Sequence, residues 1–195
     1  MKLPALVLVA IALGVGGCGS DGESANSPGT GSGAGSGTTP GPAKDASLKG
    51  SPPPLAALHK QANELLGGGA EAFEARLAKL KGHPVVVNKW ASWCPPCKAE
   101  FPFFANQAIT RGRKIAFIGV DSSDNDADAA EFLRENPVSY PSYKDPDLKV
   151  AAVFNGAGAF PSTAFYDSDG KLAYLKQGSY PTEQKLAEDI DRYAR

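Results

Sequence analysis

The sequence has little cysteine, little histidine and no excess of charge of either sign, and each shortage excludes a class of protein. Three cysteines in 195 residues are too few for a small domain held together by disulfides. Two histidines leave little with which to build a soft-metal site, and no cofactor is expected. Lys and Arg number 20 against 21 for Asp and Glu, so the positive charge needed to bind a nucleic-acid backbone is absent. We therefore expect no nucleic-acid partner.

The chain opens with an apolar run that is too short to span a bilayer. Residues 1–18 read MKLPALVLVAIALGVGGC, with a Lys at position 2 and small residues at the end of the run. A hydrocarbon core of roughly 30 Å needs a longer segment, so this run predicts a cleavable export signal. Its last four residues resemble a bacterial lipobox, which implies that Cys18 becomes the acylated N-terminus. An ordinary secretory signal with an incidental cysteine remains the alternative.

Residues 19–54 are rich in Gly, Ser and Pro and contain no aromatic residue. Such a segment cannot bury enough apolar surface to offset the entropy lost on ordering. We interpret it as a disordered tether with a root-mean-square span of roughly 30–36 Å. Together with the lipobox, it predicts a protein held by a lipid anchor at the extracytoplasmic face of the cell membrane.

Residues 55–195 are long enough for one domain with a core of normal size. Apolar spacing predicts two short helices within residues 55–81, which we interpret as a helical extension that covers one edge of a sheet. Beyond it, strands and helices alternate and then give way to a hairpin at the turn sequence DSDG. The predicted strands are 84–90, 114–121, 162–166 and 171–175, and the predicted helices are 95–109, 126–136, 147–154 and 181–193. This order predicts an α/β sandwich with a mixed sheet and flanking helices.

The informative chemistry lies where the first long strand meets its helix, in the stretch WASWCPPCKAEFP, residues 90–102. This position places Cys94 at the helix N-terminus, where unpaired N–H groups and the helix dipole favour a thiolate. Cys94 is therefore predicted to be the accessible nucleophile. Cys97, one turn further, is predicted to be buried and to resolve the mixed disulfide that Cys94 forms.

Three other interpretations explain the cysteine pair less well. As a staple, so short a loop removes only about 1.9 kcal/mol of unfolded-state entropy. As half of a zinc site, the pair needs two more ligands, and His83 lies roughly 20 Å away at the other end of the strand. An idle buried pair does not explain why Trp93 and Pro95 frame the helix start.

The stretch VVVNKWASWCPPCKAEFP resembles the active-site segment of the TlpA/ResA-type thioredoxin-like proteins, which are extracytoplasmic thiol–disulfide oxidoreductases. The likeness extends through Gly119-Val120-Asp121 and through FPSTAFY, residues 160–166, and covers most of residues 82–195. It implies a thioredoxin-like fold, and it implies that Pro161 is a cis-proline facing the two cysteines, where the substrate chain docks.

Three residues near the motif bear on the mechanism. Asn88 stands where thioredoxin carries a buried acid, and an amide cannot accept a proton. Glu100, on the Cys97 side of the helix, matches a Glu used by ResA-like members; an ordinary solvated carboxylate is the alternative. Lys89 replaces the usual aromatic residue, points away from Asn88 by strand alternation, and is expected to extend its ammonium group to solvent.

Pro95 and Pro96 lack N–H groups that could stabilise the Cys94 thiolate, which favours a reducing pair. We therefore expect a monomeric, membrane-tethered disulfide reductase whose dithiol is restored by a membrane electron donor. By resemblance, its protein substrates include apocytochrome c, and cytochrome c biogenesis and antioxidant activity are the associated roles. An oxidase or isomerase, a peroxiredoxin-like peroxidase and a non-enzymatic lipoprotein binding module are the alternatives.

Overall fold

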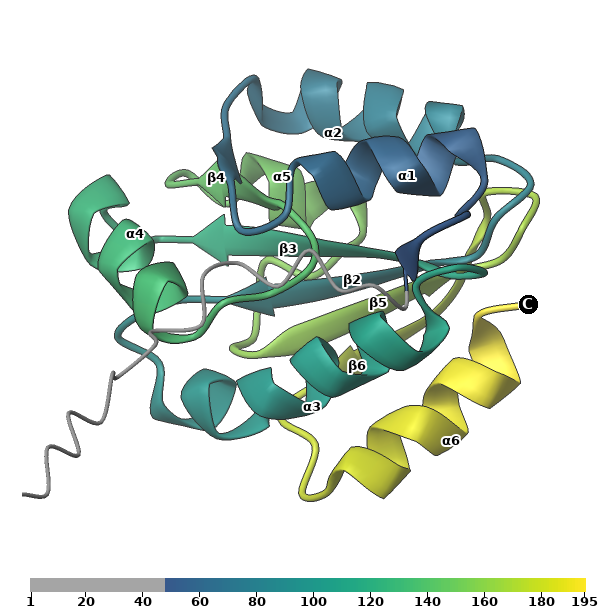
Figure 1. Ribbon diagram of the computed structural model, residues 1–195. Coiled ribbons are helices and arrows are strands. Elements are labelled where there is room, and N and C mark those ends of the chain that lie inside the picture. The colour runs from purple at the N-terminus through teal and green to yellow at the C-terminus, as the bar shows by residue number, and fades with distance from the viewer. Residues whose placement is uncertain (1–47) are drawn as a thin grey trace, which may run out of the picture. The chain divides into compact units, whose positions relative to one another are not determined.

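The computed structural model describes residues 48–195, so the predicted signal, Cys18 and most of the tether lie outside the described residues. Helices and strands alternate along this part of the chain (Figure 1). In chain order they are α1 (Pro53–Lys60), β1 (Leu65–Leu66), α2 (Gly69–Lys79), β2 (Val85–Trp90), α3 (Pro95–Arg111), β3 (Ala116–Ser122), α4 (Asp126–Glu135), β4 (Ser142–Asp145), α5 (Lys149–Val153), β5 (Ser162–Tyr166), β6 (Leu172–Gln177) and α6 (Glu183–Tyr193).

The strands form one six-stranded mixed sheet in the order β1-β4-β3-β2-β5-β6. The first four are parallel, whereas β5 runs antiparallel to β2 and β6 antiparallel to β5. Strands β2 and β3 are buried at every position, as their β-branched runs predict for strands covered on both faces. The predicted mixed α/β sandwich is therefore confirmed.

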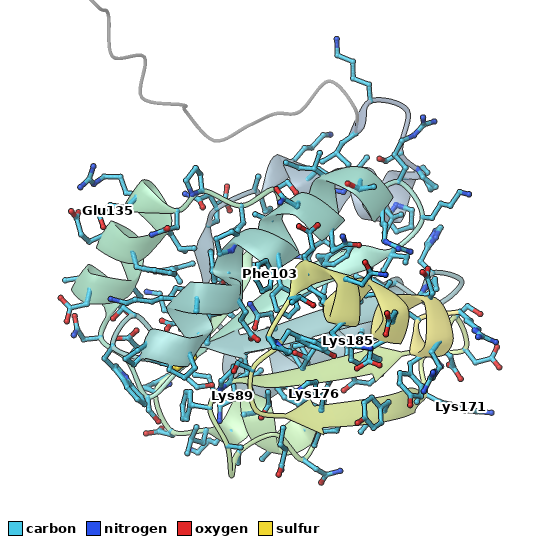
Figure 2. The ribbon with its side chains drawn as sticks, turned by 90° about the horizontal axis from the view of Figure 1, so that it is seen from below. Lys89, Phe103, Glu135, Lys171, Lys176 and Lys185 are labelled. Atoms are coloured by element: carbon cyan, nitrogen blue, oxygen red, sulfur yellow. A yellow bond between two sulfur atoms is a disulfide. The ribbon has the colours of Figure 1, made fainter. Side chains whose placement is uncertain are left out.

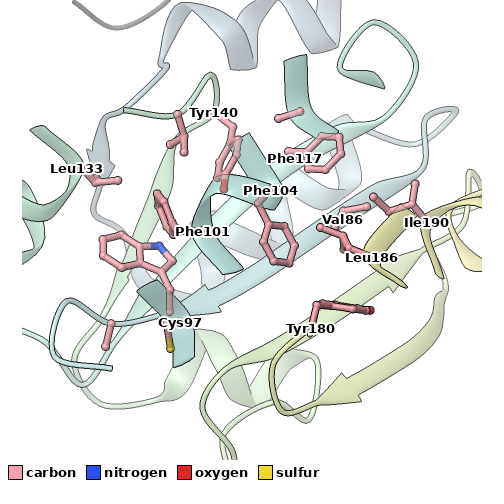
Figure 3. Packing of buried hydrophobic residues seen from close by; sticks show 14 of the residues in the cluster. Val86, Cys97, Phe101, Phe104, Phe117, Leu133, Tyr140, Tyr180, Leu186 and Ile190 are labelled. Atoms are coloured by element: carbon pink, nitrogen blue, oxygen red, sulfur yellow. The ribbon is translucent and has the colours of Figure 1, made fainter. Parts of the chain in front are cut away.

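Each face of the sheet carries its own apolar cluster. On one face, α3, α4 and α6 pack through Phe101, Phe104, Phe132, Leu186 and Ile190 (Figure 3). On the other, α1, α2 and α5 pack through Leu55, Leu58, Phe73 and Val150. Figure 1 shows α1, α2 and α5 on one side of the strands and α3 and α6 on the other. Because side chains alternate along a strand, successive residues of β2 contribute to different clusters.

Two expectations about the N-terminal part are wrong. The segment 55–81 does not cap a sheet edge, because α1 and α2 bury their apolar residues on a face of the sheet, and Leu65–Leu66 forms edge strand β1 instead of ending a helix. The predicted tether also ends earlier than residue 54. Leu48 is already buried, and α1 begins at Pro53, since proline fits the first turn of a helix.

Strand β4 was missed by the sequence analysis. It holds four residues, Ser142–Asp145, which is too short a run to show a clear alternation. Its place beside β3 depends on Gly119, because a Cβ there would come within 2.1 Å of the Ser142 hydroxyl oxygen. That hydroxyl accepts a hydrogen bond of 3.1 Å from the Trp90 indole. Glycine thus allows three neighbouring strands to approach at this point.

Candidate active site

Cys94 and Cys97 form a disulfide at the N-terminus of α3, with 5.3 Å between their Cα atoms. Cys94 is the N-cap of this helix in an extended conformation, and Pro95 and Pro96 occupy its first turn. Prolines suit those positions, where backbone N–H groups have no partner within the helix. The local sequence therefore places both sulfur atoms at the positive end of the helix dipole, as expected.

One backbone N–H group donates to the Cys94 sulfur. It belongs to Cys97 and lies 3.2 Å from Sγ. The two intervening residues are prolines and cannot donate. A thiolate formed at Cys94 would therefore be stabilised by a single backbone donor from its own turn.

The two cysteines do not differ in exposure, which departs from the prediction that Cys94 is the accessible one. In the disulfide form each residue is 1% exposed. Both pack within the aromatic cluster of the α3 face, where Cys97 lies at the end of the helix (Figure 3). Their different positions at the helix terminus, rather than their exposure, distinguish the two thiols.

The Phe160–Pro161 peptide bond is cis, as the resemblance implied. Lys89 near the end of β2 pairs with Ser162 at the start of the antiparallel strand β5. The residues that follow β2 and those that precede β5 therefore lie at the same end of the sheet. This register brings the segment that contains Pro161 to the end at which the cysteines lie.

Trp93 is the most exposed large apolar side chain of the described residues, at 53%. Its indole nitrogen donates to the Ser123 carbonyl at 2.8 Å, and its ring centroid lies 5.0 Å from that of Phe160. The exposed aromatic group beside Cys94 is thus held between the loop after β3 and the loop before β5. Sequence analysis named Trp93 but missed Phe160, although Phe160 stands next to the predicted cis-proline.

Glu100 is completely buried, so the expected alternative of a solvated surface carboxylate is wrong. One carboxylate oxygen accepts a hydrogen bond of 2.7 Å from the Tyr180 N–H, and the other has no partner. Burial raises the pKa of Glu100 to about 7, opposed by the Tyr180 hydrogen bond and the charge of Lys176. A carboxyl group one turn beyond Cys97 that titrates near neutral pH is suited to proton transfer.

Asn88 lies in the middle of the sheet and is 2% exposed. Neither its amide oxygen nor its amide nitrogen makes a hydrogen bond of normal geometry. The amide faces the hydroxyl of Tyr140, whose pKa is raised by burial and lowered in part by this neighbour. Asn88 therefore supplies a neutral polar group beneath the site and no proton acceptor.

The expectation that Lys89 extends its ammonium group to solvent is wrong. The residue is fully buried, and its ammonium group donates to the carbonyl oxygens of Gly156, Ala157 and Ala159 at 2.9, 3.2 and 2.9 Å. Its place in β2 can be followed in Figure 2. The reason is tertiary, because the partners come from a segment more than sixty residues away in sequence.

The loop between β3 and α4 also supports the site, and sequence analysis missed it. The Asp124 carboxylate accepts hydrogen bonds from the N–H and the hydroxyl of Ser92, at 2.5 and 2.9 Å. Nearby, burial and the charge of Asp124 raise the pKa of Asp121 to about 8. The only sequence signal for this contact was the acidic stretch that follows a buried strand.

Within residues 48–195, no group of three or more His, Cys, Asp or Glu side chains is arranged to hold a metal ion. None of the helices in the same part of the chain is long and apolar enough to cross a bilayer.

Residues 65–190 match the Redoxin family model. The chain is 29% identical over 104 residues to the thiol-disulfide oxidoreductase ResA of Bacillus subtilis, which covers 53% of this chain and 58% of that protein. It is 28% identical over 156 residues to the thiol:disulfide interchange protein DsbE of Pasteurella multocida, covering 75% and 81%. A DsbF homologue from Corynebacterium diphtheriae superimposes with a TM-score of 0.55 at 32% identity, over 60% of this chain and 75% of the other. With its thioredoxin-like sheet and its paired cysteines, the chain belongs to the Redoxin family and is of the same type as the thiol–disulfide oxidoreductases ResA and DsbE.

Proposed function

We propose that this chain is a membrane-tethered, extracytoplasmic disulfide reductase that acts through Cys94 and Cys97. The observation that carries the proposal is the disulfide between Cys94 and Cys97 at the start of α3, one helical turn before the buried carboxyl group of Glu100, whose pKa is raised to about 7. The relatives named ResA and DsbE support the same reaction type.

The reaction proceeds by two thiol–disulfide exchanges. In the reduced protein, the Cys94 thiolate attacks one sulfur of the substrate disulfide, forming a mixed disulfide and releasing the other substrate sulfur as a thiolate. The Cys97 thiolate then attacks the Cys94 sulfur, which forms the intramolecular disulfide and releases the second substrate thiolate. Two electrons pass to the substrate, and both leaving thiolates take up protons.

Glu100 is suited to the second exchange, because Cys97 must lose its proton before it attacks. A group with a pKa of about 7 can accept that proton and release it again at neutral pH. Asn88, at the position where thioredoxin carries an acid, cannot substitute for it. We assign Glu100 as the proton acceptor for Cys97.

The reducing direction is favoured by the shortage of donors around the Cys94 sulfur. Only the Cys97 N–H of this helical turn donates to it, because Pro95 and Pro96 have no N–H groups. A dithiol whose thiolate is poorly stabilised gives up its electrons more readily, in contrast to strong oxidants whose reduced forms are stabilised.

Equilibration with glutathione tests whether the protein acts as a reductase or as an oxidase, because it gives the reduction potential of the cysteine pair. We expect a reduction potential more negative than about −230 mV, in the range of reducing thioredoxin-like proteins. A potential near about −120 mV, typical of a strong oxidase, would overturn the assignment as a reductase.

Tethering and partners belong to the same proposal. The lipobox-like end of residues 1–18 and the Gly/Ser/Pro-rich segment after it support anchoring through Cys18 at the extracytoplasmic face of the membrane. A membrane electron donor would then restore the dithiol. Protein disulfides are the substrates, and apocytochrome c is included because the resemblance to TlpA/ResA-type proteins implies it.

A further inference from the structure

Lys89 is a fully buried cation in a central strand of the sheet, a position that ordinarily destabilises a fold. All three N–H bonds of its ammonium group are used, because it donates to the carbonyl oxygens of Gly156, Ala157 and Ala159. These carbonyls replace the lost hydration. They belong to the segment between α5 and Pro161, so the cation ties this segment to β2.

The same ammonium group lies over an aromatic ring that reaches the active site. Its nitrogen is 3.6 Å from the ring centroid of Phe160, close enough for a cation–π interaction. The Phe160 ring in turn packs against the indole of Trp93, at 5.0 Å between centroids. A continuous chain of contacts therefore runs from Lys89 through Phe160 to the exposed side chain next to Cys94.

The other end of this segment is also fixed by a buried charge. The Asp145 carboxylate accepts hydrogen bonds of 2.8 and 3.0 Å from the N–H groups of Val150 and Ala151, at the start of α5. The negative charge of Asp145 also acts on the Lys89 ammonium group. Burial lowers the pKa of Lys89 to about 8, and the charge of Asp145 opposes this shift, so the ammonium form prevails at neutral pH.

We propose that Lys89 is a positioning residue for substrate docking, which holds the segment 156–160, and with it Phe160 and Trp93, in the arrangement that receives a protein disulfide. The inference rests on the proposed function, with the substrate chain docking at Pro161 as the family resemblance implies, and adds a residue that does not itself touch the substrate. Its distinguishing consequence is that Lys89 matters for protein disulfides and not for disulfides too small to contact this surface.

The test compares two probes, insulin and bis(2-hydroxyethyl) disulfide, with the full-length protein kept reduced by dithiothreitol, whose direct reaction with each probe is subtracted. The Lys89→Met variant keeps the length of the side chain but loses the donors and the charge. We expect its kcat/KM for insulin to fall by about tenfold, as small displacements of docking groups do, with a change of less than about twofold for the small disulfide. Hydrogen exchange at residues 156–160 should become faster in the same variant.

Lys98→Met serves as the matched control. Lys98 is exposed on α3 next to Cys97, so its loss removes one positive charge near the thiols without altering the segment 156–160. We expect the ratio of the two kcat/KM values to stay at that of the wild type. A purely electrostatic effect on the cysteines would instead change both probes alike.

The proposal would be overturned if the Lys89→Met variant lost kcat/KM equally for both probes. It would also be overturned if kcat/KM for insulin did not fall. If that variant does not fold, Phe160→Leu decides, because it leaves Lys89 and the backbone in place but removes the ring between Lys89 and Trp93. A fall in kcat/KM for insulin alone supports the proposal. An unchanged ratio of the kcat/KM values for the two probes overturns it. Failure of the wild type to reduce either probe would count against the proposed function instead.

Discussion

At the scale of single residues, Glu100 combines complete burial with a single hydrogen bond from the Tyr180 N–H. Its folded-state pKa of about 7 exceeds the ordinary value of 4.5. The folded protein therefore holds a proton that the unfolded chain releases between these two values. Stability contributed by this group is present below the unfolded pKa and is lost as the pH rises through the folded pKa.

The oxidised protein should accordingly lose unfolding free energy between about pH 5 and pH 8, by up to ~3 kcal/mol from Glu100 alone. The Glu100→Gln variant keeps a neutral side chain at every pH. Its unfolding free energy should therefore fall by up to ~3 kcal/mol less over the same pH range. Urea denaturation at both pH values measures the difference. Using the disulfide form removes thiol titration, and parallel pH dependences in the two proteins would contradict the prediction.

The charge of Glu100 should also act on the thiols of the reduced protein. Its ionised form repels a thiolate, so Glu100→Gln is expected to lower the thiol pKa values and make the site a poorer reductant. Titration of thiolate absorbance measures this change. Glu188→Gln, an exposed carboxylate on α6, is the matched control and should leave the titration unchanged. Superimposable curves for all three proteins would reduce Glu100 to a structural role.

The separate roles of the two cysteines predict different behaviour on substitution. Cys97→Ser leaves Cys94 free to attack but removes the thiol that resolves the mixed disulfide, so covalent adducts with protein substrates should accumulate. Cys94→Ser should accumulate few or none. Electrophoresis without reductant displays the adducts, and equal trapping by the two variants would show that the roles are assigned wrongly.

At the scale of elements, the close approach of β2, β3 and β4 determines where the loops of the site begin. Trp90 and Ser142 are joined by a hydrogen bond across Gly119, and a Cβ at Gly119 would meet both side chains. The loop that follows β3 contains Ser123 and Asp124. These two residues accept hydrogen bonds from Trp93 and Ser92 in the loop that follows β2. Packing between these strands therefore supports the active-site loop from below.

Gly119→Ala should destabilise the protein by ~2 kcal/mol, because the added methyl group overpacks a buried contact. Gly67→Ala is the control, since a Cβ there meets no atom within 4 Å. Urea denaturation of the two variants at one pH gives the comparison. Equal free energies of unfolding would show that Ser142 moves aside without cost.

At the scale of the whole molecule, we expect location to depend on the predicted export signal and tether, and chemistry on the domain that follows. On the proposed function, the anchor and tether would confine the protein near the membrane, within reach of an electron donor in the bilayer. Anchoring and catalysis should therefore be separable by substitution.

Cys18→Ala should move the protein from the membrane fraction to the soluble extracytoplasmic fraction, or block its processing, while the exported domain keeps its activity on soluble disulfides. Cell fractionation followed by an insulin reduction assay measures both properties. Cys94→Ser should stay with the membrane, which separates loss of the anchor from loss of activity. Wild-type protein recovered in the soluble fraction would contradict the prediction.

Features that depend on neighbouring residues in the chain could be predicted from the amino-acid sequence. The run of β-branched residues predicted β2, the DSDG turn predicted the β5–β6 hairpin, and the prolines after Cys94 predicted the start of α3. These signals are local, because hydrogen-bonding capacity and backbone restriction act within a few residues. The spacing of Cys94 and Cys97 indicated the thiol pair, and the family resemblance added the cis-proline.

Which polar groups are buried, and which hydrogen bonds compensate for their burial, depends on contacts between distant parts of the chain. Glu100 accepts a hydrogen bond from the N–H of Tyr180, eighty residues later in the chain. The Lys89 ammonium group donates to carbonyl oxygens of residues 156–159. Strands β1 and β4 are likewise defined by pairing with each other and not by their own short sequences. Desolvation depends on every group packed around a side chain, and most of these groups are distant in sequence. For that reason the expected reach of Lys89 to solvent was wrong, and the burial of Glu100 required the fold.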